Sequence, residues 1–533
     1  MSTVITSSSA WLALARFRLR LDRLRIASWV IAGVVLTATV ASTWDSLYPT
    51  AQERVDFAAT LQAAPALTAL LGPLQAPTST GGLTTWRVGG LSVLMIGIVI
   101  VFLVIRHTRT DMSASRTDLI LSGRLPRRSV ISSGVVPAMV MSIGIGAACA
   151  LALGASAGGW ISAGIYGLSV AGSLVLFAAI ASLIAQAVNS SRGANGIGVL
   201  VVSLAFVLTA IGNTRDVSAL AEMTPFGWMA KASPYAQDMW GWAVLPFLVA
   251  GVVMAVSLAV ASGRDVGSAW TTEGLGRERA PAWLSHPQAL IWRVDRGVIV
   301  GWFIGIFAMA LFMGYFSGSL TEILAENPQM AELIARLSHG EPSATFTKLI
   351  LVFAALGAAG FPISILVRTA VDENEGRIEL MLSTRMSRVQ LLRARLAEVV
   401  VGSVLLLMVV GMGVGVVSGF FTDSRPSALS DSIGLAMVSL PAVWFIAALT
   451  ALIVAISPRL AWLGWLLLAW CVVVGELAPL MNLPSWTERL SPYWYSPEWP
   501  ITGDVWQSIA MTVASAVLMA MSFIVFARRR IPH

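Results

Sequence analysis

The chain has 533 residues, of which 56% are hydrophobic and only 12% charged, and its mean hydropathy is +0.78. This composition excludes an ordinary soluble domain and predicts a membrane protein. The net charge is +7 and the isoelectric point is about 10. Because cytoplasmic loops favour Lys and Arg, we attribute this excess to membrane topology and anionic lipid, and expect no nucleic-acid partner.

Long apolar stretches recur along the whole sequence. A helix that crosses a bilayer needs about 20 mostly apolar residues. Twelve stretches meet this need, centred on residues 26–43, 89–105, 129–153, 160–188, 193–213, 241–262, 297–316, 349–367, 399–421, 432–457, 460–475 and 505–527. Arginines gather in alternate connecting segments, which places both termini in the cytoplasm. The sequence predicts an all-α, multi-pass protein of the cell membrane with twelve transmembrane helices, in contact with lipid.

A basic, amphipathic stretch precedes the first span. Leu14, Phe17, Leu21 and Leu24 fall on one helical face among arginines, which predicts a helix at the inner membrane surface. A cleaved signal peptide is the alternative for this region. The same motif recurs in mid-chain before the seventh span, so we expect the first span to be retained. The matching residues are Arg20, Asp22, Arg23 and Trp29 with Arg293, Asp295, Arg296 and Trp302.

A charged loop pattern occurs twice. The loop after the second span contains RTDLILSGRLPR from Arg116, and the loop after the eighth contains RIELMLSTRMSR from Arg377. The offset of 261 residues between the copies also pairs Asp111 with Asp372. Each copy combines an apolar ridge with charges of both signs, which suits a soluble protein surface. The repeat predicts two docking points for a partner on one membrane face.

The two loops belong to two halves of six spans each. We predict a first half over residues 1–262, a cytoplasmic linker with an interfacial helix over 263–296, and a second half over 297–533. An even number of spans gives both halves the same orientation. They are therefore predicted to be parallel repeats related by an axis along the membrane normal.

Several chemistries are disfavoured by what the sequence lacks. It has no phosphate-binding loop of the Walker type, so we do not expect this chain to bind ATP by itself. The twelve apolar cores contain no Asp, Glu, Lys, Arg or His. Ion-driven transporters usually place such groups inside their spans, so this argues against a proton-coupled antiporter.

Candidate catalytic and metal-binding residues are few. The four histidines are scattered along the chain, and we predict neither a metal site nor a catalytic site. His107 is interpreted as a solvated loop residue. Asp45, with Glu53 and Asp56 nearby, invites comparison with membrane glycosyltransferases that carry acidic residues in an early outer loop. The alternative is that these acids form the polar face of an outer helix.

The second charged loop, VDENEGRIELMLSTRMSR at 371–388, resembles the loop after the second span of type-2 ABC transporter permeases. In that family an acidic run, Gly-Thr, Leu-Glu and Leu-Leu-Ser lead into a basic residue. The first copy departs from the pattern, because residues 112–115 replace the acids and the glycine. The resemblance implies docking on two copies of an ABC ATP-binding subunit, which would bind ATP and Mg²⁺, with no cofactor in this chain. The residues expected at the docking points are Asp111, Arg116, Asp118, Leu119, Leu121, Arg124, Arg127, Asp372, Glu373, Glu375, Gly376, Arg377, Glu379, Leu380, Leu382, Arg385 and Arg388.

Three further segments resemble the fused twelve-span permeases of actinobacterial exporters: SGRDVGSAW at 262–270, WRVDRGVIVGW at 292–302 and TPFGWMAKASPY at 224–235. That subfamily is associated with polyketide and ionophore antibiotics, including tetronasin-type resistance systems, and with multidrug efflux. The resemblance implies a transport subunit, not an enzyme, in an ATP-driven exporter of lipophilic or amphipathic compounds. A path between spans 2 and 5 and spans 8 and 11 would carry side chains that could contact a drug: Met95, Phe102, Phe206, Trp462, Trp465 and Trp470. For each of these, helix packing or an aromatic belt at the membrane interface is the alternative.

Two other functions stay open at this point. A six-plus-six arrangement also fits a secondary transporter that needs no ATPase, and a membrane enzyme acting on lipid-linked substrates would use acids such as Asp45. Transport in membranes without an ATPase would favour the first, and product formation by the isolated chain would favour the second.

Overall fold

The computed structural model is helical throughout the residues that it describes, which form no strand. These are residues 7–62, 68, 71–111, 127–188, 190–214, 218–262, 281–326, 342–384, 386–421, 425–475, 486–497, 499–501 and 505–529. The chain divides into two compact units, Met1–Gly276 and Arg277–His533. This division falls within the predicted linker 263–296.

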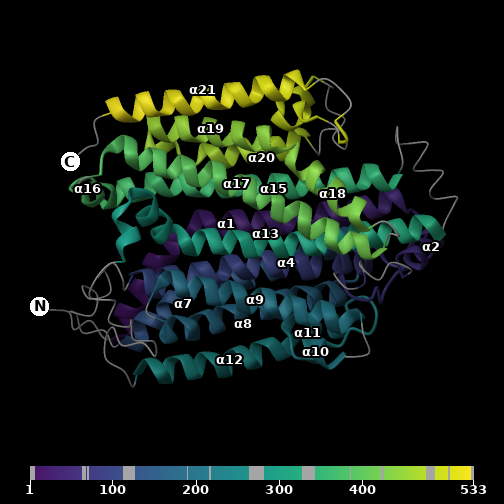
Figure 1. Cartoon of the computed structure of the whole chain (residues 1–533). Helices are drawn as coiled ribbons and strands as arrows, with labels where there is room; N and C mark the ends of the chain where they lie inside the picture. Colours follow the sequence, from purple (N-terminus) through teal and green to yellow (C-terminus); the bar gives the residue numbers. More distant parts are fainter. Residues whose placement is uncertain are drawn as a thin grey trace, which may run out of the picture. The chain divides into compact units, whose positions relative to one another are not determined.

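Six long helices build unit 1 (Figure 1). They are α1 (Ser7–Leu47), α4 (Thr80–Ile105), α7 (Arg127–Ala157), α8 (Trp160–Ala187), α9 (Ser191–Thr214) and α12 (Trp240–Ser262). A π-helical turn, Arg106–Thr110, extends α4. The described residues between the long helices also form the short helices α2 (Ala51–Gln62), α10 (Ser218–Glu222) and α11 (Pro225–Ala232). Helix α8 is the most buried, because α4, α7 and α12 all pack against it.

Small residues let α7 and α8 approach closely. A Cβ atom on Gly167 would lie 2.3 Å from the carbonyl oxygen of Gly146 and 2.7 Å from Cβ of Ala150. Helices that pack inside a bilayer gain little from the hydrophobic effect, so close backbone contact through small residues is a main source of their association.

We therefore expect Gly167→Ala to destabilise unit 1. A methyl group has no space against a backbone oxygen, and overpacking costs about 1–3 kcal/mol. The measurement is the loss of the monodisperse peak with temperature for detergent-purified protein. Gly164→Ala is the matched control on the same helix, because its Cβ would meet nothing within 4 Å. Equal stability of the two variants would contradict the close-contact interpretation.

Among its described residues, unit 2 has a 3₁₀ turn at Ala282–Ser285 followed by four long single helices and one pair of consecutive helices. They are α13 (Pro287–Glu326), α15 (Pro342–Asn374), α17 (Arg388–Ser418), the pair α18 (Arg425–Met437) and α19 (Leu440–Ile456), and α21 (Trp506–Arg528). The shorter elements are α16 (Arg377–Leu382), α20 (Leu463–Gly475) and the 3₁₀ turns Gly419–Phe421, Pro458–Leu460, Glu488–Leu490 and Pro492–Tyr495. Helix α17 packs against α13, α15 and α18, and α19 packs against α21.

Eleven helices of the described residues are long and apolar enough to cross a membrane. The chain is therefore a multi-pass membrane protein. The twelve spans predicted from the sequence differ at one place: the stretch expected at 460–475 is a shorter apolar helix, Pro458–Val474. The predicted span 432–457 lies within one membrane-crossing segment, Pro426–Ile456, but this segment consists of two helices, α18 and α19, separated by a turn before Leu440.

The predicted amphipathic helix before the first span is the beginning of α1 and is continuous with that span. Phe17, Leu21 and Leu24 are exposed on one side, as the pattern predicts for a face in contact with lipid, whereas Arg18 and Asp22 are buried on the other. The buried side carries the first of two charged clusters.

Candidate functional site

The second charged loop folds into a turn, a short helix and the start of the next span. Gly376 has a φ of 72°, a left-handed conformation that glycine adopts without strain, and it separates α15 from α16. Ser387 then caps α17: its side chain accepts from the backbone N–H of Gln390, whose side chain accepts from the backbone N–H of Ser387. Figure 1 shows α16 at one end of unit 2, where Arg388 of α17 also meets Arg529, the residue after α21. The loop is therefore an ordered projection.

Asp372 fixes this projection to the helices behind it. Its side chain is buried, and its Oδ1 accepts from Nε of Arg377 at 2.8 Å. Its Oδ2 accepts from Nη2 of Arg395 in α17 at 2.8 Å. One carboxylate thus joins the beginning of α16 to the inside of the helix bundle.

The network continues to α13. Arg395 also forms an ion pair with Asp295, which Arg368 approaches with its Nε at 2.9 Å. Asp295 and Arg395 are almost completely buried. A buried charge is stable only when it is paired, so this cluster ties α13, α15 and α17 together.

A second tie runs from the loop to the C-terminal helix. Arg529 pairs with Glu373 and donates from Nη1 to the carbonyl oxygens of Val454, at 2.9 Å, and Ala455, at 3.2 Å. Arg388 donates to the backbone oxygen of Arg529 at 2.6 Å. The charged loop is therefore bonded to the end of α19 and to the residue that follows α21.

These contacts divide the predicted docking residues of the second loop. Asp372, Glu373 and Arg388 are engaged within unit 2, and Leu382 packs partly against its core. The side chains that project outward are those of Glu375, Glu379 and Leu380, and Leu380 is 72% exposed. Arg377 is intermediate, since it pairs with Asp372 and Glu375. Arg385 lies outside the described residues.

The first charged loop is described only at its two ends. Arg116, Asp118, Leu119, Leu121 and Arg124 lie outside the described residues. Asp111 follows the π-helical turn, and Arg127 begins α7. Docking at this loop stays a prediction.

Unit 1 has its own charged cluster, centred on Asp22 of α1. Asp22 accepts from Nη1 of Arg106 at 2.8 Å and of Arg25 at 3.1 Å, and it contacts Nε2 of His107. His107 is buried, so its interpretation as a solvated loop residue is wrong. The π-helical turn continues the helix beyond Ile105 and carries His107 inward; such turns are common at functional sites.

Each unit has a buried arginine beside the acid of its charged loop, but the two arginines come from helices that do not correspond: Arg18 from α1 in unit 1 and Arg395 from α17 in unit 2. At the offset of 261, Arg395 corresponds to Gly134, and at the offset of 273, Arg18 corresponds to Ile291. In unit 1, Arg18 donates to the carbonyl oxygen of Val130 at 2.7 Å, and a Cβ on Gly134 would lie only 3.0 Å from its Nη1. The guanidinium of Arg18 thus lies beside Gly134, the position in unit 1 that corresponds to Arg395 in unit 2. Each unit retains a buried arginine beside the acid that starts its charged loop, at 4.0 Å from Asp111 and 2.8 Å from Asp372.

These clusters revise the prediction that the spans carry no ionisable groups. The twelve apolar stretches predicted from the sequence contain no Asp, Glu, Lys, Arg or His, but the helices of the structure are longer than those stretches. Asp22, Asp295, Arg395 and Glu398 all lie within helices that qualify as spans. Except for Glu398, each has a charged partner within 3.1 Å.

The predicted substrate-path residues separate into two groups. Met95 and Phe102 of α4, and Trp462, Trp465 and Trp470 near α20, are exposed on the surfaces of their units. Phe206 of α9 is partly buried and packs edge-on against Phe226, with ring centroids 5.4 Å apart. Contact with a transported compound remains a prediction for all six.

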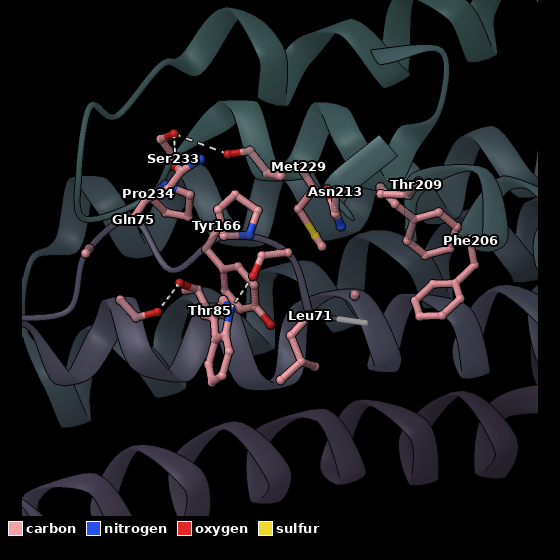
Figure 2. A pocket seen from close by; sticks show the side chains of 18 residues that line it. Leu71, Gln75, Thr85, Tyr166, Phe206, Thr209, Asn213, Met229, Ser233 and Pro234 are labelled. Atoms are coloured by element: carbon pink, nitrogen blue, oxygen red, sulfur yellow. Dashed lines mark hydrogen bonds between the residues drawn. The ribbon is translucent and has the colours of Figure 1, made fainter. Parts of the chain in front are cut away.

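Phe206 lines a small cavity in unit 1, which Figure 2 shows with Tyr166, Thr209 and Asn213 around it. The cavity measures about 80 Å³ and lies between α4, α8, α9 and α11. Thr224 positions α11 as its N-cap, accepting from the backbone N–H of Gly227. Since ligand pockets for drug-sized molecules are about 300–1,000 Å³, this cavity holds at most a small apolar group.

Comparison with known proteins gives a similarity that covers both units. The family described as "Multidrug efflux system permease Rv1217c, C-terminal domain" matches residues 284–527. The chain is similar to a permease over nearly its whole length. It is 29% identical over 523 residues to the multidrug efflux system permease protein Rv1217c of Mycobacterium tuberculosis, which covers 97% of this chain and 94% of that protein. Both charged loops lie within the span of this similarity.

Proposed function

We propose that this chain is the permease subunit of an ATP-driven ABC exporter of lipophilic or amphipathic compounds, acting in multidrug or antibiotic efflux. The observation that carries the proposal is the ordered α15–α16–α17 segment, which presents Glu379 and Leu380 outward while Asp372 and Glu373 hold it to the bundle. The similarity to a multidrug efflux permease supports the same function.

The proposal includes a twelve-span arrangement of two parallel six-helix repeats with both termini in the cytoplasm. The internal packing of the units supports it: α1 packs on α7 and α8 on α12 in unit 1, and α13 packs on α17 and α19 on α21 in unit 2. These are the corresponding helices if α20 is counted as a short span. The charged loops then lie on the cytoplasmic side.

In this mechanism two ABC ATP-binding subunits dock on the two charged loops and supply ATP and Mg²⁺. Their closure pushes on α16, and the charged cluster at Asp372 carries the movement to α13, α15 and α17. The units then move as bodies, which opens a path for a lipophilic compound between the spans. The chain itself binds no nucleotide in this scheme.

Co-purification tests the docking assignment. The chain, co-expressed with the ABC ATP-binding subunits of its own genome, is expected to retain one of them. A Glu379→Arg/Leu380→Asp variant is expected to retain at least about tenfold less of the ATP-binding subunit. The double substitution replaces an exposed apolar side chain by a charged one and inverts the charge of its neighbour. Arg377 is avoided, since its substitution would also break the ion pair with Asp372.

Leu490→Asp is the matched control, an exposed leucine of the same unit in the turn Glu488–Leu490, away from α16. It should bind the ATP-binding subunit as the unmodified chain does. Unchanged binding and unchanged drug-stimulated ATP hydrolysis in the Glu379→Arg/Leu380→Asp variant would refute docking at α16.

The two alternatives have distinct tests. Transport by the purified chain in liposomes without any ATP-binding subunit would favour a secondary transporter, for which the carboxylate of Glu398 inside a span is the supporting observation. Product formation that is lost in Asp45→Asn would favour an enzyme. In the structure Asp45 is exposed and pairs with Arg54 at 3.4 Å.

A further inference from the structure

A groove opens on unit 2 between the start of α13 and the first half of α17. It is a shallow, open groove with a volume of about 470 Å³. Trp283, Gln288, Ala289 and Trp292 line one side, and Ala394, Ala397, Glu398 and Val401 line the other. Both tryptophans are about half exposed, so the groove has aromatic walls and a floor of small side chains.

Glu398 places a carboxyl group in this apolar groove. Its side chain is only 9% exposed, and among the described residues neither carboxylate oxygen has a hydrogen-bond partner. The nearest cation is Arg395, whose Nη1 lies 3.8 Å from Oε2 of Glu398. Burial without a close partner is costly for a carboxylate, which makes such a group inside a span a candidate binding site.

Arg395 is already shared by two other acids. Its Nη2 donates to Asp372 at 2.8 Å, and its Nη1 pairs with Asp295. Arg368 also pairs with Asp295, at 2.9 Å. Glu398 is therefore the acid of this cluster that no arginine approaches within hydrogen-bonding distance, and it is the one that faces the groove.

We propose that this groove binds lipophilic organic cations, with Glu398 as counter-ion and Trp283 and Trp292 as aromatic walls. A cation placed there gains an ion pair in a site shielded from water and attraction to the faces of the tryptophans. Its apolar groups are buried against the alanines. As a statement about the exporter's substrates this rests on the proposed function, whereas the binding itself requires no ATP-binding subunit.

The site belongs to the second half of the chain. At the offsets of the internal repeat, Glu398 corresponds to Pro137 and Trp292 to Leu19. The counter-ion and one aromatic wall are thus missing from the first half, so one cation per chain is expected at this type of site.

Direct binding of radiolabelled tetraphenylphosphonium to the purified full chain in lipid nanodiscs tests the proposal. Saturable binding is expected, and Glu398→Gln should weaken it by about tenfold through loss of the charge. Tetraphenylborate, which has nearly the same shape and the opposite charge, should not compete. Trp292→Leu should weaken binding by about threefold, and it leaves the charged cluster intact.

Asp431→Asn is the matched control, because it removes an exposed carboxylate from α18 in the same unit, its side-chain oxygen can still accept from Nε1 of Trp499, and it should leave binding unchanged. Unaltered affinity in a monodisperse Glu398→Gln variant, or equal competition by tetraphenylborate, would overturn the proposal. Retention of an aminophospholipid that is lost in Glu398→Gln, without phosphonium binding, would also overturn it and assign the groove to lipid. Failure of the ATP-binding subunit to co-purify would affect the proposed function alone.

Discussion

Arg395→Leu is expected to leave little folded protein. Arg395 is about 1% exposed and holds two buried acids, Asp372 and Asp295, so its loss strands negative charge inside the bundle. Removing one partner of a buried ion pair costs about 3–5 kcal/mol. The free energy of unfolding of a typical protein is only about 5–15 kcal/mol, so this loss is a large part of it. The measurement is the yield and thermal stability of the monodisperse peak in size-exclusion chromatography.

Arg393→Leu is the control for this substitution, because Arg393 is exposed on the same helix two residues away. It should behave as the unmodified chain does. A second change, Asp372→Asn, should restore part of the stability of Arg395→Leu by removing one stranded charge. If Arg395→Leu were as stable as Arg393→Leu, the cluster would not be a structural tie, and transmission from α16 to α13 would lose its basis.

The fold was largely predictable because the length and apolarity of a span are properties of a short stretch of sequence. The two differences have local causes that hydropathy does not register. The predicted span 432–457 contains Pro441 in the first turn of α19, a new helix that begins at Leu440 after a turn. The predicted span 460–475 starts with the 3₁₀ turn Pro458–Leu460, so its α-helix begins only at Leu463.

The charged clusters were predictable only in part. The internal repeat singled out Asp22 and Asp295, and the paired loops singled out Asp111 and Asp372. Their arginines were missed, because Arg18 and Arg395 come from helices that do not correspond in the two halves. His107 was misjudged because sequence periodicity does not reveal a π-helical turn beyond an apolar run. Glu398 was missed since it lies directly before the apolar core 399–421.

The contacts of Arg529 predict a variant that binds the ATP-binding subunit but does not transport. Arg529 joins Glu373 of the charged loop to the ends of α19 and α21, while the outward side chains Glu379 and Leu380 do not depend on it. In Arg529→Ala, docking should therefore persist and the movement of α16 should reach α21 less effectively. Because coupling energies between sites are typically 1–3 kcal/mol, we expect transport to fall by about tenfold.

The measurements are co-purification with the ATP-binding subunit and accumulation of a lipophilic dye in cells that produce both proteins. Arg528→Ala is the control for the loss of a positive charge, because Arg528 is the last residue of α21, is exposed and takes no part in the contact with Glu373. It should export the dye normally. Loss of binding in Arg529→Ala would show that Arg529 supports the fold of the docking loop, and normal export would show that force reaches the spans through Asp372 and Arg395 alone. Retained binding with lost export, by contrast, requires that the loop acts on α19 and α21 through this arginine.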